Sequence, residues 1–430
     1  MSEERRRRLR EYGLTVGELG SSGGQTVVVA LLPVLLAPYA PSAVWIGAII
    51  ATEGLFALAI PYFTGVLSDR LPPPLANRYG RRTLFLLTSA PVMAAALIVM
   101  PFQRGFWALS VPAFVFFAAF NVYTTLLRTL LIDVVPTSRW GRVQGFLGVL
   151  HAGGLGYGLV AGGLLFAVWS PLPFLLGAAL IVVFTATTYG LAPRNDSARD
   201  MGARSQGGNR VRVVPERLFW SELVRRSDVG WFLVANGLWT GAVDGLRPYI
   251  FLYAAYVLGT TVAETSLLLV VMLIGVAIGA YAFGRAGDRL GRGRVLLYTA
   301  LGTAGIMALG TGVRTVPGAI AVLVPAGLGA AAFIALPYPV FVQLASLDQL
   351  GRFTGVYSMS VGVARFMAPL VVGRTIDFGA RLYPELYGYP LLWPVVALMM
   401  LLGAVALKRA DRLSDGRLLA RPGAAGRQKG

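Results

Sequence analysis

The chain has 430 residues, of which 56% are hydrophobic and only 13% are charged. A soluble protein of this length needs two or three charged domain surfaces, and about half of the usual charge is missing. There is no cysteine and only one histidine, which excludes disulfide scaffolds, thiol chemistry and zinc sites of the His/Cys kind. The composition predicts a protein whose outer surface faces lipid.

Twelve runs of mostly apolar residues are long enough to cross the hydrocarbon core, which takes about 20 residues. Between the sixth and the seventh run lies the longest polar stretch, which ends in a short amphipathic segment. We expect membrane-spanning helices at residues 14–38, 43–67, 83–103, 107–132, 143–169, 171–192, 229–257, 262–284, 295–313, 318–342, 354–379 and 386–408.

The basic residues predict the orientation of these helices. Of the 38 Lys and Arg residues, 31 fall in the two termini, the central stretch and the loops after spans 2, 4, 8 and 10. The positive-inside rule then places both termini in the cytoplasm, and we expect a multi-pass protein of the inner membrane. The net charge of +18 is spread over all inner loops, as contact with anionic lipid requires, so we expect no nucleic-acid partner.

The two halves of the chain repeat a motif. Gly65-Val-Leu-Ser-Asp69-Arg70 ends span 2, and Gly284-Arg-Ala-Gly-Asp288-Arg289 ends span 8. A basic cluster follows each copy, with Arg81 and Arg82 after Gly80 in the first half and Arg292 after Gly291 in the second. Gly80 and Gly291 are 211 residues apart, and Gly141 and Gly351, which open spans 5 and 11, are 210 residues apart. Two parallel six-helix repeats explain these nearly equal spacings.

The pattern Gly-x-x-x-Asp-Arg-x-Gly-Arg resembles the major facilitator superfamily. The second copy matches it without gaps, and the first copy carries a proline-rich insertion between Arg70 and Gly80. The resemblance covers essentially the whole chain and implies a two-lobed monomeric transporter that opens a central cavity alternately to each side. The expected fold is all-α and integral to the membrane, with twelve helices in two pseudo-symmetric lobes. The expected parts are an N-terminal lobe (1–192), a cytoplasmic linker with a short amphipathic helix (193–228), a C-terminal lobe (229–408) and a basic cytoplasmic tail (409–430).

The motif also has a physical interpretation of its own. A carboxylate at a helix end can accept hydrogen bonds from arginine and from the amides that begin a neighbouring helix. Such a cluster can break and re-form as the lobes move, which favours a conformational latch over a static topology anchor. The expected latch residues are Gly65, Asp69, Arg70, Arg81, Arg82, Gly284, Asp288, Arg289, Gly291 and Arg292.

Ionisable residues inside spans are costly to insert and therefore indicate function. Glu53 has no basic neighbour in its own span, and burial favours the protonated form of a lone carboxyl group. Glu53, Asp244 and Glu18 are the candidates for proton coupling. Each has a structural alternative: a helix-packing hydrogen bond for Glu53, mutual neutralisation by Arg247 for Asp244, and a solvated helix end for Glu18. His151 is interpreted as a packing residue or a proton relay.

Helical periodicity gathers polar residues on single faces of spans 1, 4 and 7, and the superfamily resemblance implies that spans 1, 4, 7 and 10 line the cavity. Trp239 lies next to the face in span 7, and an aromatic ring there can stack on an apolar ligand surface. Arg365 is interpreted either as a ligand-binding residue or as a packing residue that donates to carbonyl groups. The cavity candidates are Gln25, Asn121, Arg128, Asn236, Trp239, Thr240, Arg247, Tyr338, Gln343 and Arg365.

Span 4 carries a second resemblance. Asn121 is followed by Arg128 seven residues later and by Asp133, which resembles the sucrose transporter branch of the glycoside–pentoside–hexuronide cation symporters. This resemblance implies that Arg128 contacts substrate or couples to a proton-binding acid. The branch has an additional Asp earlier in span 4, where this chain has only the residues 114–117, Phe-Val-Phe-Phe, so the coupling acid must lie elsewhere.

These patterns predict a secondary active transporter that imports a sugar or a similar polar solute together with a proton, with sodium as the other possible ion. The alternative is a proton-coupled exporter of amphipathic compounds on the same fold. We expect no enzyme activity, metal or cofactor, because the sequence has no metal cluster, phosphate-binding loop, nucleophile elbow or dinucleotide fingerprint. The expected partners are a small-molecule substrate, a proton and membrane lipids.

Overall fold

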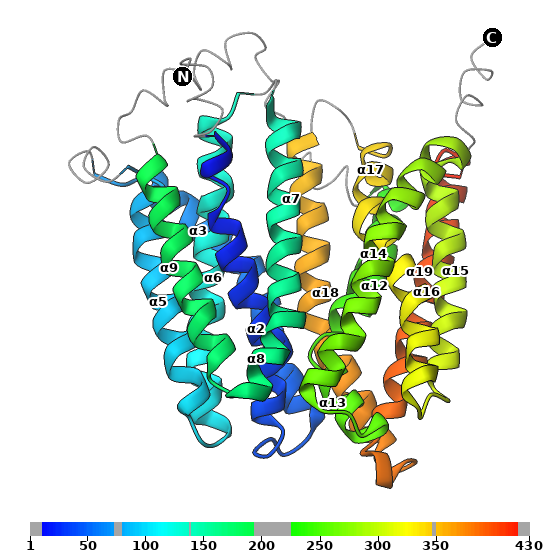
Figure 1. The fold of residues 1–430 in the computed structure, drawn as a ribbon. Helices are drawn as coiled ribbons and strands as arrows, with labels where there is room; N and C mark the ends of the chain where they lie inside the picture. The colour runs from blue at the N-terminus through cyan, green and yellow to red at the C-terminus, as the bar shows by residue number, and fades with distance from the viewer. Residues whose placement is uncertain (1–10, 73–79, 137–138, 193–224, 346–349, 420–430) are drawn as a thin grey trace, which may run out of the picture. The chain divides into compact units, whose positions relative to one another are not determined.

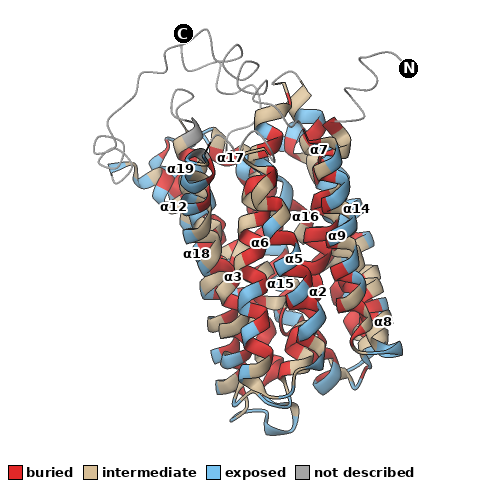
Figure 2. Ribbon diagram, turned by 90° about the vertical axis from the view of Figure 1, so that its left-hand side faces the viewer, coloured by how far each residue is buried: buried red, intermediate tan, exposed pale blue. Residues whose placement is uncertain are grey.

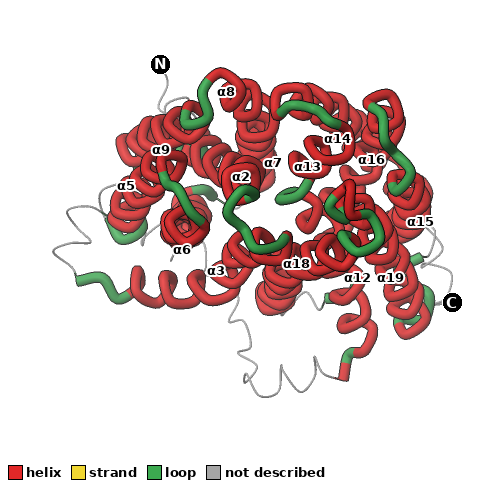
Figure 3. The backbone as a smooth tube through the Cα atoms, turned by 90° about the horizontal axis from the view of Figure 1, so that it is seen from below, coloured by secondary structure: helices red, strands yellow, loops and turns green. Residues whose placement is uncertain are grey.

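The computed structural model describes residues 11–72, 80–136, 139–192, 225–345 and 350–419 (Figure 1). Within these ranges all the regular secondary structure is helical, and Figure 3 draws no strand. The chain divides into two compact units. The polar stretch 193–224, with most of the expected amphipathic helix, lies outside the described residues.

Unit 1 comprises residues 1–40, 55–210 and 261–266. Its helix α2 is the most enclosed, since 83% of the apolar window in that span is buried, compared with 22% in the span that contains α14 (Figure 2). Helix α2 packs against α6, α7 and α9. The helices of this unit are α2 (Gly17–Leu36), the second part of α3 (Ala43–Asp69), α5 (Thr83–Val99), α6 (Phe106–Val134), α7 (Trp140–Gly156), α8 (Gly162–Val168) and α9 (Leu172–Leu191).

Small residues explain the close approach of α2 to its neighbours. A Cβ atom at Gly20 would lie 2.8 Å from the Leu180 carbonyl oxygen of α9, and one at Gly154 of α7 would lie 2.7 Å from the Gly23 amide nitrogen. In lipid, apolar side chains gain little by associating, so helices pack through such backbone approaches and through interhelical hydrogen bonds. The glycines of α2 and α7 therefore allow α2 to pack closely against α7 and α9.

Unit 2 comprises residues 41–54, 211–260 and 267–430. Helix α12 packs against both α18 and α19, and α15 packs against α16 and α19. The helices of this unit are the first part of α3, α12 (Ser227–Leu246), α13 (Ile250–Tyr253), most of α14 (Val262–Leu290), α15 (Arg292–Gly310), α16 (Val316–Ala335), α17 (Pro337–Val342), α18 (Leu350–Gly379) and α19 (Leu392–Leu413).

Eleven of the described helical segments are long and apolar enough to cross a membrane, and they coincide with eleven of the expected spans. The remaining expected span is broken, because α12 ends at Leu246 and α13 begins at Ile250, followed by a π-helical turn at Ala254–Leu258. The predicted all-α membrane fold is confirmed. Helix α19 continues to Leu413, beyond the expected end of the last span at 408.

Two helices are divided between the units. The first part of α3, up to Gly54, belongs to unit 2, and the part from Leu55 onwards belongs to unit 1. Conversely, α14 begins with residues of unit 1, up to Ser266, and continues in unit 2. These two helices are spans 2 and 8, which occupy equivalent positions in the internal repeat.

Candidate transport site

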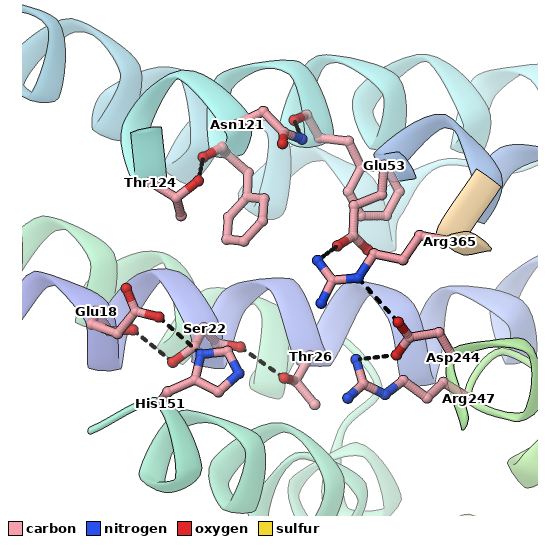
Figure 4. Close-up of polar contacts among 12 residues, drawn as sticks. Glu18, Ser22, Thr26, Glu53, Asn121, Thr124, His151, Asp244, Arg247 and Arg365 are labelled. Carbon is pink, nitrogen blue, oxygen red and sulfur yellow. Dashed lines mark hydrogen bonds and ion pairs between the residues drawn. The ribbon is translucent and has the colours of Figure 1, made fainter. Parts of the chain in front are cut away.

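Four charged side chains of unit 2 form a chain of alternating sign (Figure 4). Arg365 of α18 donates from Nε to Oδ2 of Asp244 on α12 at 3.0 Å. Its Nη1 lies 3.8 Å from Oε1 of Glu53 on α3. Asp244 also forms an ion pair with Arg247, one helical turn further along the chain, and its Oδ1 lies 3.1 Å from Nη1 of Arg247. The sequence-predicted candidates Glu53, Asp244, Arg247 and Arg365 therefore lie together, and their formal charges cancel.

Burial makes this arrangement costly to disrupt. The carboxyl side chains of Asp244 and Glu53 are 11% and 9% exposed, whereas the guanidinium side chains of Arg247 and Arg365 are 30% and 36% exposed. Removing an isolated carboxylate from water costs several kcal/mol, so each buried acid needs a cation or a proton. The cluster can consequently exchange an ion pair for a bound proton, which is the elementary requirement for proton coupling.

A polar network lies further along α12 and α18. Asn236 donates from Nδ2 to the Ser360 hydroxyl at 3.1 Å and accepts from the Tyr357 hydroxyl at 3.1 Å. Tyr338 of α17 lies 2.9 Å from the Thr354 hydroxyl of α18. These contacts use the polar groups of Asn236 and Tyr338 within the protein and fix their side chains.

The other candidates of unit 2 occupy different surroundings. Trp239 is 1% exposed and packs between helices, where its Nε1 donates to the Met400 carbonyl at 3.4 Å and its ring lies against Gly403 and Phe333. Thr240 is half-buried on α12. Gln343 is exposed at the end of α17 and lines a polar hollow with residues of α12 and α19. The structure thus brings neither Trp239 nor Gln343 to the charged cluster.

Unit 1 contains a second acidic site. Oε1 of Glu18 on α2 lies 2.8 Å from Nδ1 of His151 on α7, and the Glu18 side chain is 4% exposed (Figure 4). Its Oε2 accepts no hydrogen bond from any described residue. The Ser22 hydroxyl donates to the Glu18 main-chain carbonyl at 2.6 Å, so it fixes the backbone rather than the carboxyl group. Glu18 is therefore a paired, buried acid and not a solvated helix end.

The remaining candidates of unit 1 do not join this pair. Gln25 is buried on α2, two turns from Glu18. Asn121 is 6% exposed and donates from Nδ2 to the Phe117 carbonyl of its own helix at 2.9 Å. Arg128 is exposed on α6 and forms no hydrogen bond or ion pair with the residues that the structure describes. The spacing of Asn121 and Arg128 on one helix is therefore not accompanied by a mutual contact.

No group of three or more His, Asp or Glu side chains among the described residues is arranged to hold a metal ion. The arginines of the charged cluster stay protonated, so the proton chemistry available there is confined to the carboxyl groups.

A family model described as the Major Facilitator Superfamily matches residues 14–261 and 245–425. The chain belongs to this superfamily. Superfamily members are transporters, so the chain is a multi-pass membrane transporter, and the resemblance inferred from the repeated motif is confirmed.

A curated relative resembles part of the chain, and several solved structures share its fold. The chain is 24% identical over 261 residues to "Multidrug resistance protein MdtG" of Proteus mirabilis (strain HI4320), and the match spans 59% of this chain and 60% of that relative. A bacterial homologue of the human lysosomal transporter Spinster, in an inward-facing and unoccupied conformation, gives a TM-score of 0.75 at 13% identity, covering 97% and 99% of the two chains. The nucleoside transporter NupG gives 0.72 at 14% identity, covering 93% of this chain and 98% of that one.

The superfamily motif after span 2 is partly described. Arg82 donates from Nε to Oδ2 of Asp133 on α6 at 3.1 Å and from Nη1 to the Ser68 hydroxyl. Arg70 is exposed, whereas the side chain of Asp69 lies outside the described residues. Gly80 has a φ of +82°, which a residue with a Cβ adopts only with strain. The first copy therefore connects the ends of α3, α5 and α6.

The second copy of the motif in this superfamily member has a simpler geometry. Arg292 donates from Nη2 to Oδ1 of Asp288 at 3.1 Å. The side chains of Asp288, Arg289 and Arg292 are all exposed. Gly291 has a φ of +96°, which matches the backbone of Gly80 in the first copy. A Cβ at Gly65 or Gly284 would meet no atom within 4 Å, so neither glycine is required here for close packing.

Three features of the candidate sites were not identified from the sequence: one pairing and two sets of residues. The pairing of His151 with Glu18 joins residues 133 positions apart, and periodicity within one helix cannot reveal it. Tyr357 and Ser360 are ordinary hydroxyl residues of span 11, and only the position of α12 beside α18 makes them partners of Asn236. Asp377 lies near the end of span 11. Charged residues are common where a span meets the membrane surface, so the sequence alone does not distinguish Asp377 from an ordinary boundary residue.

Proposed function

We propose that this transporter is driven by protons, and that Glu53 is the residue that takes up the coupling proton. The observation that carries this proposal is the position of Arg365 between two buried carboxyl groups on different helices. Coulomb attraction falls with distance, so Arg365 holds Asp244, at 3.0 Å, more strongly than Glu53, at 3.8 Å. A proton on Glu53 consequently displaces the weaker of the two contacts.

In this mechanism, Asp244 remains ionised because Arg365 and Arg247 both contact it. When Glu53 is protonated, Arg365 is held by Asp244 alone and can move with α18. When Glu53 releases its proton, the attraction between α3 and α18 returns. Proton binding and helix position are then linked through a single guanidinium group.

We further propose that the transported compounds are amphipathic and that they leave the cell in exchange for protons. The relative described as a multidrug resistance protein supports this direction, although that match spans 60% of its length. The positive-inside rule predicts cytoplasmic termini, and in that orientation the Ala43 end of α3 faces outward.

Import of a polar solute with a proton is the second candidate. The amide and hydroxyl groups of Asn236, Tyr357 and Ser360 favour this candidate. They bond to one another in this structure, and the same groups can bind substrate hydroxyls if those bonds are exchanged. In this case accumulation of the solute inside the vesicle, rather than its expulsion, follows the proton gradient.

The test uses purified full-length protein in liposomes with an imposed pH gradient and a library of lipophilic cations and labelled disaccharides. We expect pH-driven movement of an amphipathic compound that a protonophore abolishes. Glu53→Gln should abolish gradient-driven accumulation while retaining exchange at equal pH, because a permanent amide cannot release a proton. The exposed acid Glu385, changed to Gln, provides the matched control and should transport normally. Disaccharide accumulation favours the second candidate, and flux that is independent of pH contradicts proton coupling altogether.

A further inference from the structure

The first part of α3 is held at its Ala43 end by a carboxylate. Asp377 of α18 accepts from the Ala43 amide through Oδ1 at 2.7 Å and from the Val44 amide through Oδ2 at 3.1 Å. The amides at the start of a helix have no partner within the helix, and an anion there is further stabilised by the helix dipole. Asp377 therefore supplies, from another helix, an acceptor for the amides that begin α3.

Tyr249 strengthens the same junction. Its hydroxyl lies 3.1 Å from the Ala43 carbonyl oxygen and 2.8 Å from the Pro369 carbonyl oxygen, so its proton is available to α3 and to α18. Tyr249 is fully buried at the break between α12 and α13. Three helical segments thus meet at the first turn of α3.

A row of glycines keeps α3 close to α18 from this junction onwards. A Cβ at Gly47 would overlap the Pro369 carbonyl, and a Cβ at Gly54 would overlap the Phe366 amide. On the opposing helix, a Cβ at Gly373 would lie 2.8 Å from the Val44 Cα atom. Backbone contact of this kind fixes the distance between the helices, and it leaves no space for a side chain to adjust.

Glu53 lies at the other end of this row, next to Gly54. It is ten residues after Ala43, which is about 15 Å along a straight helix. Because the segment Ala43–Gly54 is one continuous helix in unit 2, the anchor at its first turn determines where Glu53 lies relative to Arg365. Beyond Gly54, α3 continues in unit 1.

We propose that Asp377 is a positioning residue for transport: it holds the Ala43–Gly54 segment of α3 against α18 so that Glu53 meets Arg365, and protonation of Glu53 releases this segment. Among the described residues of unit 2, the charged groups that face Glu53 include Arg365 of α18 and, behind it, Asp244 and Arg247 of α12. Asp377 faces the two α3 amides and the phenol groups of Tyr249 and Tyr389. The proposal rests on the proposed function, because it assigns to Glu53 the coupling proton.

The chain has no cysteine, so a single introduced cysteine can be labelled specifically in the full-length protein in liposomes. Ile50 is 4% exposed and lies between Gly47 and Gly54 on the face that contacts α18, so Ile50→Cys places a smaller thiol in the seam. The rate of reaction with N-ethylmaleimide, normalised to the same variant unfolded at the same pH, reports separation of α3 from α18. Leu97→Cys on α5, which is fully buried in unit 1, reports any general opening.

With Ile50→Cys alone, we expect the normalised rate to rise by about tenfold as the pH falls and Glu53 is protonated. Adding Asp377→Ala or Glu53→Gln should give the fast rate at every pH, whereas Asp377→Glu and the control Glu385→Gln should retain the pH dependence. Leu97→Cys should stay slow in all backgrounds.

Two results overturn the proposal. The first is a rate that does not depend on pH in the Ile50→Cys protein. The second is an Asp377→Ala variant that leaves the pH dependence in place, even if all rates rise by one factor, since this is the behaviour of a merely structural residue. Labelling does not require transport, so pH-dependent labelling without proton-driven flux would contradict the proposed function and leave the positioning role standing.

Discussion

Glu18 and His151 are in direct contact, with 2.8 Å between Oε1 of the acid and Nδ1 of the only histidine in the chain. The two residues lie on α2 and α7, which pack against each other in unit 1. The direction of this hydrogen bond depends on the tautomer of the imidazole ring.

The first prediction concerns the energy of this pair. His151→Ala should destabilise the protein, because it leaves a 4%-exposed carboxyl group without its basic partner. Glu18→Gln in the same background should recover part of the loss. Thermal unfolding of the four proteins in detergent measures the coupling, which we expect to be about 0.5–2 kcal/mol. Strictly additive effects would mean that the contact contributes nothing to stability.

The second prediction concerns Arg365. Arg365→Ala leaves Glu53 and Asp244 facing each other without the cation between them, which should cost up to about 3 kcal/mol, less than for a fully buried pair because the side chain is 36% exposed. Adding Asp244→Asn should restore stability but not pH-driven transport, since the link to Glu53 stays broken. Unfolding in detergent and flux in liposomes separate the two effects. Normal flux in the Arg365→Ala protein would exclude the guanidinium from coupling.

The third prediction tests the loop of the second motif copy. Gly291 has a φ of +96°, so Gly291→Ala should cost about 1 kcal/mol of folding stability through backbone strain. The matched control is Gly284→Ala, seven residues earlier, where a Cβ meets no atom within 4 Å. This control should be neutral or slightly stabilising, because alanine favours helix more than glycine does. Equal thermal midpoints for the two variants would contradict the argument from φ.

The fourth prediction is a pH dependence outside the membrane-spanning part of α12. Asp228 precedes the apolar segment that starts at Val229, and Arg226 donates to both of its carboxyl oxygens, at 2.9 and 2.8 Å. Burial alone would raise the pKa of Asp228, but the hydrogen bonds and charge of Arg226 and the backbone amides lower it below 3.8. A lowered pKa contributes stability above the unfolded value, and this contribution is lost as the pH falls through the folded value.

Arg226→Gln should therefore cost about 1 kcal/mol at pH 7, and this difference from the parent protein should shrink as the pH falls below about 4. Arg225→Gln, at the exposed neighbouring position, is the control and should have little effect at either pH. Thermal unfolding as a function of pH gives the comparison. A difference that stays constant down to about pH 3 would assign the loss to the Arg226 contact with the Leu344 carbonyl instead.

The sequence was sufficient for the fold because membrane helices are visible as apolar runs, and because a repeated charge motif needs no three-dimensional information. The exception is span 7, where Arg247 and the break before Ile250 interrupt the helix in the middle of an apolar run. Polar faces also predicted that Asp244 and Arg247 share one side of α12. The contacts of Arg365 with Asp244 and with Glu53 depend on three helices meeting, which no spacing along the chain records.

Trp239 illustrates the opposite case. Its position beside a polar stripe favoured a ligand-facing ring, but residues at the edge of such a stripe can turn towards a neighbouring helix. Gly403 leaves space for the indole ring between α12 and α19, and the Met400 carbonyl accepts its proton. Only the packing partner, 161 residues away, decides between the two orientations.

The division of α3 and α14 has a consequence for dissecting the molecule. A chain severed between residues 192 and 227 yields two fragments, and each lacks a piece that its compact unit takes from the other. The N-terminal fragment is deprived of Thr261–Ser266, and the C-terminal fragment is deprived of Pro41–Gly54 with its acid at position 53. Expressed singly, the fragments should be incomplete folding units, whereas co-expression in one cell should reconstitute a functional protein by complementation.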